Sequence, residues 1–172
     1  HTRAEAQALG RVSIPGSYIW SEMIVEYDPA ADSVVWEWRF WDHLVQDADP
    51  QKPNHGVIAE HPERLDINVG TVNLQGDWIH ANSVDYDEER DEIIISSHTL
   101  HEFYIIDHST TTEEARGSTG GRHGKGGDIL YRWGNPQNYD RGTSEDQHFY
   151  VVHGANVIRP GLAGAGNVLI FN

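Results

Sequence analysis

The sequence predicts an all-β protein made of short antiparallel strands. Apolar, β-branched and aromatic residues occur in short runs, and turns rich in Gly, Pro, Asp and Asn separate these runs. The clearest hairpin begins at Ile79, where an alternating run leads into the charged turn Asp87–Asp91 and then into the β-branched run Ile93–Ile95. Such a pattern is typical of two strands joined by a tight connection.

The other elements follow from the same signals. We expect an irregular, partly helical lead-in at residues 1–20, because Arg3–Leu9 is helix-forming and Gly10 ends it, and a single β domain at residues 21–172. Strands are expected at residues 23–27, 34–40, 79–84, 93–95, 102–107, 128–133, 151–158 and 167–171. The long segment 41–76 should pack across one face of the sheet, and the Ser/Thr/Gly-rich segment 109–127 should be an exposed loop.

A repeat emerges when the strands are aligned. The pattern Trp36-x-Trp38 returns as Tyr131-x-Trp133, and each is followed by a loop and a strand that carries a histidine, His80 or His153. These two histidines are 73 residues apart. A recurring unit of four antiparallel strands predicts the blade of a β-propeller. A β-sandwich, which also uses short strands, is the alternative.

The number of strands also predicts how much of such a fold the chain covers. It accounts for about two to two and a half blades, whereas propellers use about four to eight. We therefore expect a fragment of a longer chain, with the remainder of the propeller as the partner of its strand edges.

Composition narrows the classes of function. The formal net charge is −15, which disfavours nucleic acid and anionic membranes as partners. There is no cysteine, so disulfides and thiolate metal sites are excluded. No apolar run is long enough to span a membrane.

Several motifs, in order along the chain, resemble the arylsulfotransferase family. They are the segments 77–84, 95–97, 105–109, 126–136 and 164–172. The resemblance implies a six-bladed propeller that is periplasmic or extracellular. It also implies transfer of a sulfuryl group from a phenolic sulfate ester to a phenolic acceptor, through a transiently sulfurylated histidine and without a nucleotide donor or other cofactor.

The resemblance also implies the site residues. His153 matches the nucleophile, and His80 and Asn82 match the His-x-Asn pair that holds the sulfate oxygens. His98 stands where characterised members have an arginine, so a single titratable donor replaces a permanent bidentate cation. If His80 and His153 start the inner strands of adjacent blades, their rings should lie within about 10 Å of each other. Asn82 should face the same channel as His80, and His98 should reach it from the end of the next strand.

Other interpretations remain open. One alternative is a zinc site formed by His80, His98 and His153, although we prefer the prediction that the site holds no metal. The acidic turn 85–91 and the glycine-rich segment 122–127 are better explained as surface turns than as calcium or phosphate loops. We interpret His101 and His108 as turn or cap residues. The alternative to an enzyme is a non-catalytic propeller of the same family that acts as a binding or structural module, and a further channel histidine before residue 1 would favour the enzyme.

Overall fold

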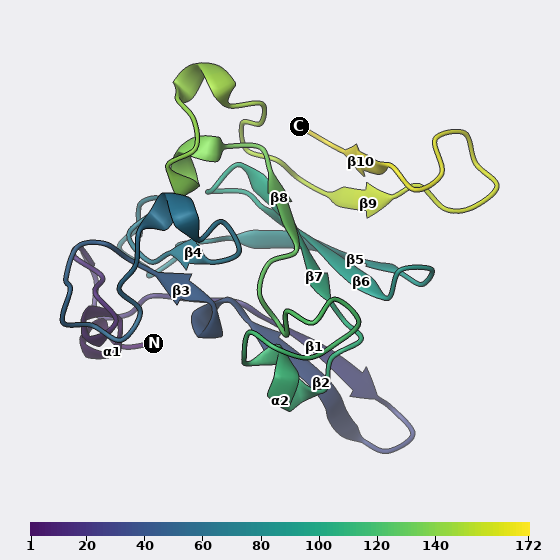
Figure 1. The fold of residues 1–172 in the computed structure, drawn as a ribbon, viewed down its shortest axis with the longest axis horizontal. Helices are drawn as coiled ribbons and strands as arrows, with labels where there is room; N and C mark the ends of the chain where they lie inside the picture. Colours follow the sequence, from purple (N-terminus) through teal and green to yellow (C-terminus); the bar gives the residue numbers. More distant parts are fainter.

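The protein is mostly β-strand, as the sequence predicts (Figure 1). The structure is a computed structural model that describes residues 1–172 throughout. It contains ten strands in one four-stranded and three two-stranded sheets, with two short α-helices. These sheets do not close into a ring within residues 1–172. No helix has the length and apolar character that a membrane crossing requires.

A four-stranded antiparallel sheet forms the centre of the fold. Its strands follow one another in space as in sequence: β5 (Ala81–Asp87), β6 (Glu92–Ser97), β7 (Glu102–Asp107) and β8 (Tyr131–Trp133). The predicted hairpin and the two strands after it are therefore confirmed. β8 is shorter than the predicted 128–133, because the Ile129 amide donates to the Glu63 carbonyl and not to β7.

Both faces of this sheet are apolar at its centre, because β6 contains three consecutive isoleucines. Ile93 and Ile95 enter a core of 19 buried residues, whereas Ile94 enters a second core of five on the opposite face. Each fully buried isoleucine stabilises the fold by about 1.5–3 kcal/mol. Alternation along β6 thus requires a packing partner on each side of the sheet.

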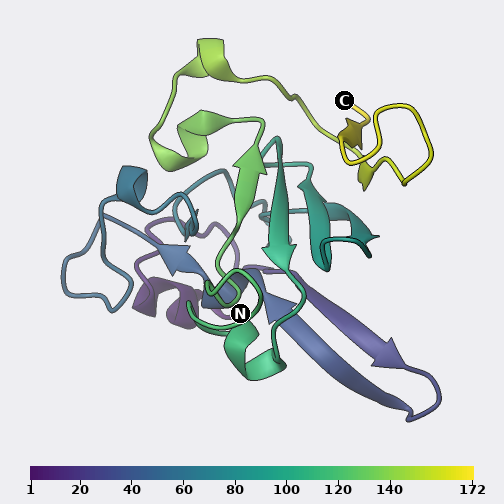
Figure 2. The same ribbon diagram turned by 45° about the vertical axis from the view of Figure 1, so that its right-hand side comes forward.

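Two hairpins supply those partners (Figure 2). The hairpin of β1 (Met23–Asp28) and β2 (Ser33–Arg39) brings Trp36 and Trp38 into the larger core. The hairpin of β9 (Ala155–Val157) and β10 (Val168–Ile170) packs on the smaller one. The central sheet therefore lies between two hairpins from opposite ends of the chain.

The two connecting regions are more ordered than loops. The lead-in forms α1 (Arg3–Ala8), which Thr2 and Glu5 cap reciprocally. The segment 41–76 contains the short parallel pair β3 (Leu44–Val45) and β4 (Leu65–Asp66), and as predicted it packs on the sheet. Its contributions to the larger core are Leu44, Leu65, Ile67 and Val72.

The prediction of an exposed loop at residues 109–127 is correct only in part, because most of the segment is exposed but some of it is helical or buried. This segment forms α2 (Thr112–Ala115), and Ala115 is fully buried. The reason lies in β2, whose buried indoles need hydrogen-bond acceptors. Trp38 Nε1 donates to the Gly127 carbonyl at 2.7 Å, and Trp36 Nε1 donates to Thr110 Oγ1 at 3.2 Å.

Candidate functional site

Three histidines meet at one end of the central sheet. His80 comes directly before β5 and His98 directly after β6, and the His98 amide donates to the His80 carbonyl at 3.0 Å. The His98 ring centroid lies 4.8 Å from that of His80 and 5.0 Å from that of His153. His80 and His153 are therefore no farther apart than about 10 Å, which meets the separation expected from the sequence. His98 lies between them.

The backbone that presents these rings differs from the prediction. His80 and His153 were expected inside strands, but β5 begins at Ala81 and β9 only at Ala155. His80 has a left-handed backbone with φ = 50°, and the register of β5 shifts between Ala81 and Ser83. The alternation argument, which placed His80 and Asn82 on the same face of one strand, is therefore wrong. The histidines converge because of turns at the strand ends.

Asn82 links two segments of the site. Its Nδ2 donates to the Val152 carbonyl at 2.8 Å, and its Oδ1 accepts from Ser96 Oγ at 2.6 Å. One of the two N–H donors of the amide group thus remains for another acceptor. Asn82 holds the segment before His153 against the central sheet.

Serine hydroxyls continue this link, and the sequence reasoning missed them. The Ser83 and Ser96 hydroxyls are 2.6 Å apart, and they accept from the amides of Ala155 at 3.1 Å and Gly154 at 3.3 Å. Ser96 is fully buried, which a polar residue tolerates only with partners. The available signal was a serine pair at the end of a run of isoleucines.

His80 has a carboxylate partner that the sequence reasoning also missed. Its Nδ1 lies 2.8 Å from Asp77 Oδ2. Since a carboxylate only accepts, Nδ1 carries a proton, and the contact with Asp77 fixes the orientation of the ring. The spacing of three residues was visible in the sequence.

His98 has the opposite environment. Its Nδ1 is shielded from solvent and has no hydrogen-bond partner. Burial lowers the pKa of His98, and His80, His153 and His101 lower it further by repulsion, against a weaker raising effect of Asp77. His98 is therefore the ring that favours the neutral form.

His153 is exposed, and its orientation is fixed from its own turn. Nδ1 donates to the Val151 carbonyl at 2.9 Å, and the backbone amide donates to the Phe171 carbonyl at 2.8 Å. A carbonyl only accepts, so the proton sits on Nδ1 and Nε2 is left as the basic nitrogen.

The alternative sites receive no support from the geometry. No three His, Cys, Asp or Glu side chains are arranged to hold a metal ion. In the acidic turn, Asp87 pairs with Arg90, and Asp91 accepts from Tyr86 and pairs with His108. Those carboxylates are occupied by the turn itself.

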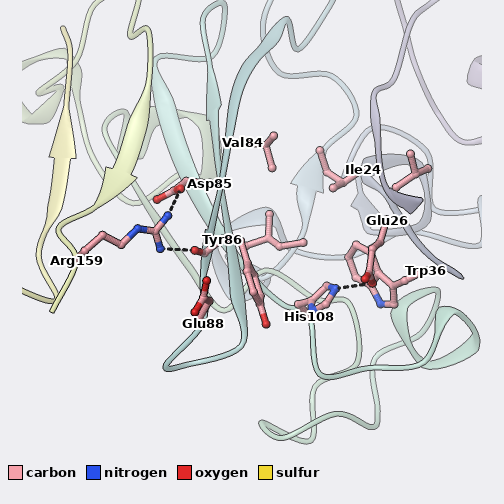
Figure 3. Close-up of a pocket in the computed structure, with 11 residues that line it drawn as sticks. Ile24, Glu26, Trp36, Val84, Asp85, Tyr86, Glu88, His108 and Arg159 are labelled. Carbon is pink, nitrogen blue, oxygen red and sulfur yellow. Dashed lines mark hydrogen bonds and ion pairs between the residues drawn. The ribbon is translucent and has the colours of Figure 1, made fainter. Parts of the chain in front are cut away.

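A cavity of about 560 Å³ lies elsewhere, between β1 and β5 (Figure 3). Four of its polar side chains form two pairs: His108 lies 3.3 Å from Glu26, and Arg159 lies 2.7 Å from Asp85. His108 thus bridges β1 and the turn after β5, which is a structural role. None of the three clustered histidines lines this cavity. We therefore place the candidate site at the histidine cluster and not at the cavity.

The fold and the site define an all-β protein with a histidine and amide cluster at the strand ends of its central sheet. The sequence model described as Arylsulfotransferase (ASST) matches residues 13–112, which is more than half of the chain. The chain therefore belongs to the arylsulfotransferase family, which points to arylsulfotransferase activity in general. His80, Asn82 and His98 lie inside the matched region, and His153 lies outside it. No curated protein and no solved structure matched the chain.

Proposed function

We propose that the protein is a nucleotide-independent aryl sulfate sulfotransferase that works through a sulfohistidine on His153. The observation that carries this proposal is the convergence of His80, His98 and His153 in a chain of this family. The donor is a phenolic sulfate ester and the acceptor a phenol, and no cofactor takes part.

The chemistry has two matched steps. In the first, the lone pair of His153 Nε2 attacks the sulfur, the bond from sulfur to the aryl oxygen breaks, and the phenoxide leaves with a proton from the site. In the second, the acceptor oxygen attacks the sulfur, the bond from Nε2 to sulfur breaks, and the acceptor's proton is released to the site. His153 is thereby restored.

The neighbours of His153 supply charge and hydrogen bonds. His80, whose ring Asp77 holds in place, donates to the sulfate oxygens when it is cationic, and the free N–H of Asn82 donates to them as well. Burial lowers the pKa of His98, so its ring favours the neutral form.

The same proposal includes the propeller. A four-stranded antiparallel sheet flanked on both faces by hairpins is what consecutive blades produce, with β5 and β9 as neighbouring inner strands. Hydrogen bonds from Ala155 to Ser83 and from Val157 to Asp85 join those strands. The family implies six blades and a periplasmic or extracellular location, with the rest of the propeller as partner.

A non-catalytic propeller of the same family is the second candidate. The observation that favours it is His98, whose neutral ring occupies the position of the family's arginine. Such a module would bind an aryl sulfate or other ligand without transferring the sulfuryl group.

An assay of the full-length protein with 4-nitrophenyl sulfate and a phenol acceptor separates the two. We expect nitrophenol release that depends on the acceptor, and its loss in His153→Ala, because this substitution removes the proposed nucleophile. His148→Ala is the matched control, since His148 stacks on Trp133 outside the cluster. Absence of acceptor-dependent release favours the binding module, and transfer that survives in His153→Ala contradicts the assigned nucleophile.

A further inference from the structure

Val151 has a backbone conformation that its side chain disfavours. Its φ is 63°, in the left-handed region, where a β-branched residue is a genuine outlier. Such a conformation costs about 1–3 kcal/mol and persists only where the surroundings enforce it. Val151 lies two residues before His153, outside any strand.

Both backbone polar groups of Val151 are bound by histidines. Its amide donates to His101 Nδ1 at 2.9 Å, and its carbonyl accepts from His153 Nδ1 at 2.9 Å. His101 lies in the turn between β6 and β7 and is itself left-handed, with φ = 60°. Val151 therefore connects the turn of the central sheet to the His153 ring.

These two hydrogen bonds determine where the ring protons are. An amide only donates, so His101 Nδ1 is unprotonated, and the neutral ring carries its proton on Nε2. His153 has the reverse arrangement, with the proton on Nδ1, since a carbonyl only accepts. The tautomers of two histidines are thus linked through one strained residue.

The rest of the segment is anchored independently. Tyr150 donates its amide to Asn172 Oδ1 at 2.8 Å, the Val152 carbonyl accepts from Asn82, and the His153 amide donates to Phe171. Val152 is fully buried in the smaller core. None of these contacts involves the backbone of Val151. The partner of the Val151 amide is His101.

We propose that His101 is a positioning residue for His153. It holds Val151 in the left-handed conformation. The Val151 carbonyl then keeps the proton on His153 Nδ1, which leaves the Nε2 lone pair free to attack the sulfur. The consequence for catalysis rests on the proposed function, whereas the tautomer itself does not.

The surroundings of His101 support this role. Burial lowers its pKa, which keeps Nδ1 unprotonated and able to accept. Two facing groups act in the opposite direction, the Glu102 carboxylate and a hydrogen bond to the His98 backbone. The Glu102 carboxylate is largely neutralised by Arg132, with which it forms a buried ion pair.

The test is ¹⁵N NMR of the His153 ring, which reports the tautomer without any substrate. Free neutral histidine favours the proton on Nε2, so a majority of the Nδ1–H form in the wild type would require the Val151 carbonyl. We expect His101→Ala to shift His153 to an Nε2–H majority. His148→Ala is the matched control and should leave the tautomer unchanged.

A glycine variant keeps the test independent of simple misfolding. Glycine adopts positive φ readily, so His101→Ala combined with Val151→Gly should restore the Nδ1–H form. In the transfer assay, His101→Ala should lower kcat by roughly ten- to a hundredfold with KM little changed. A wild-type tautomer in His101→Ala, or an Nε2–H majority in the wild type, overturns the proposal. If every tautomer is as predicted but neither the wild type nor any variant transfers the sulfuryl group, only the proposed function is contradicted.

Discussion

His98→Arg tests the electrostatics of the site most informatively. His98 lies between His80 and His153, with its ring centroid 5.0 Å from that of His153. The substitution replaces a ring that favours the neutral form by a permanent cation beside the expected sulfate position.

The size of the effect follows from the distance. A unit charge about 5 Å from the sulfate contributes roughly 3 kcal/mol at an effective dielectric constant of about 20. Since His80 and His153 are exposed, solvent screening reduces this to about 1 kcal/mol. A gain of that size raises kcat/KM about fivefold.

The size of the effect on kcat/KM depends on pH. Because the pKa of His98 is lowered, the wild-type ring becomes cationic at a lower pH than an ordinary histidine and is neutral at alkaline pH. The ratio of kcat/KM for His98→Arg to that of the wild type should therefore be near one at acidic pH. It should rise to about fivefold at alkaline pH. Taking the ratio at each pH cancels the titration of every group whose pKa the substitution leaves unchanged.

The assay is 4-nitrophenyl sulfate turnover with a phenol acceptor across the pH range, and His98→Gln is the control that cannot become cationic. We expect His98→Gln to match the wild type at alkaline pH and to fall below it at acidic pH. A ratio for His98→Arg that is flat with pH, or below one at alkaline pH, would refute this account of His98.

Two further predictions concern stability. Glu102→Gln should lower the free energy of unfolding by about 3–5 kcal/mol in urea, because it leaves the buried Arg132 charge without its partner, whereas the exposed control Glu88→Gln should change little. A loss below about 1 kcal/mol would contradict this. Burial raises the pKa of Asp66 to about 6, so its stabilising contribution is complete below its ordinary pKa and is lost as pH rises through about 6. Asp66→Asn should therefore raise the free energy of unfolding by about 1–2 kcal/mol at neutral pH and not near pH 4, and equal effects at both would be inconsistent with the shift.

The sequence predicted those parts of the fold that are determined by local pattern. The charged turn after β5 and the run Ile93–Ile95 specify a hairpin whose second strand is buried on both faces, and the alternating tryptophans of β2 specify a strand packed on a core. The alternating tryptophans have the two-residue period of a strand, and a short β-branched run bounded by turn residues is typical of a buried strand.

What the sequence could not show depends on contacts between distant residues. The left-handed backbones of His80 and Val151 could not be predicted, since histidine adopts positive φ only occasionally and a β-branched valine almost never does. Residues 109–127 look like a flexible loop, yet they supply the hydrogen-bond acceptors of Trp36 and Trp38. The links from Asn82 to Val152 and from His101 to Val151 likewise join residues 50 or more positions apart.

The central claim is that His153 carries the sulfuryl group, and a trapping experiment tests it most directly. The full-length protein is mixed with 4-nitrophenyl sulfate without an acceptor, kept alkaline, digested and mapped by mass spectrometry. We predict one added SO₃ group on the peptide that contains His153, its absence in His153→Ala, and its disappearance when a phenol is added. An adduct on another residue, or nitrophenol release without any adduct, would contradict the claim.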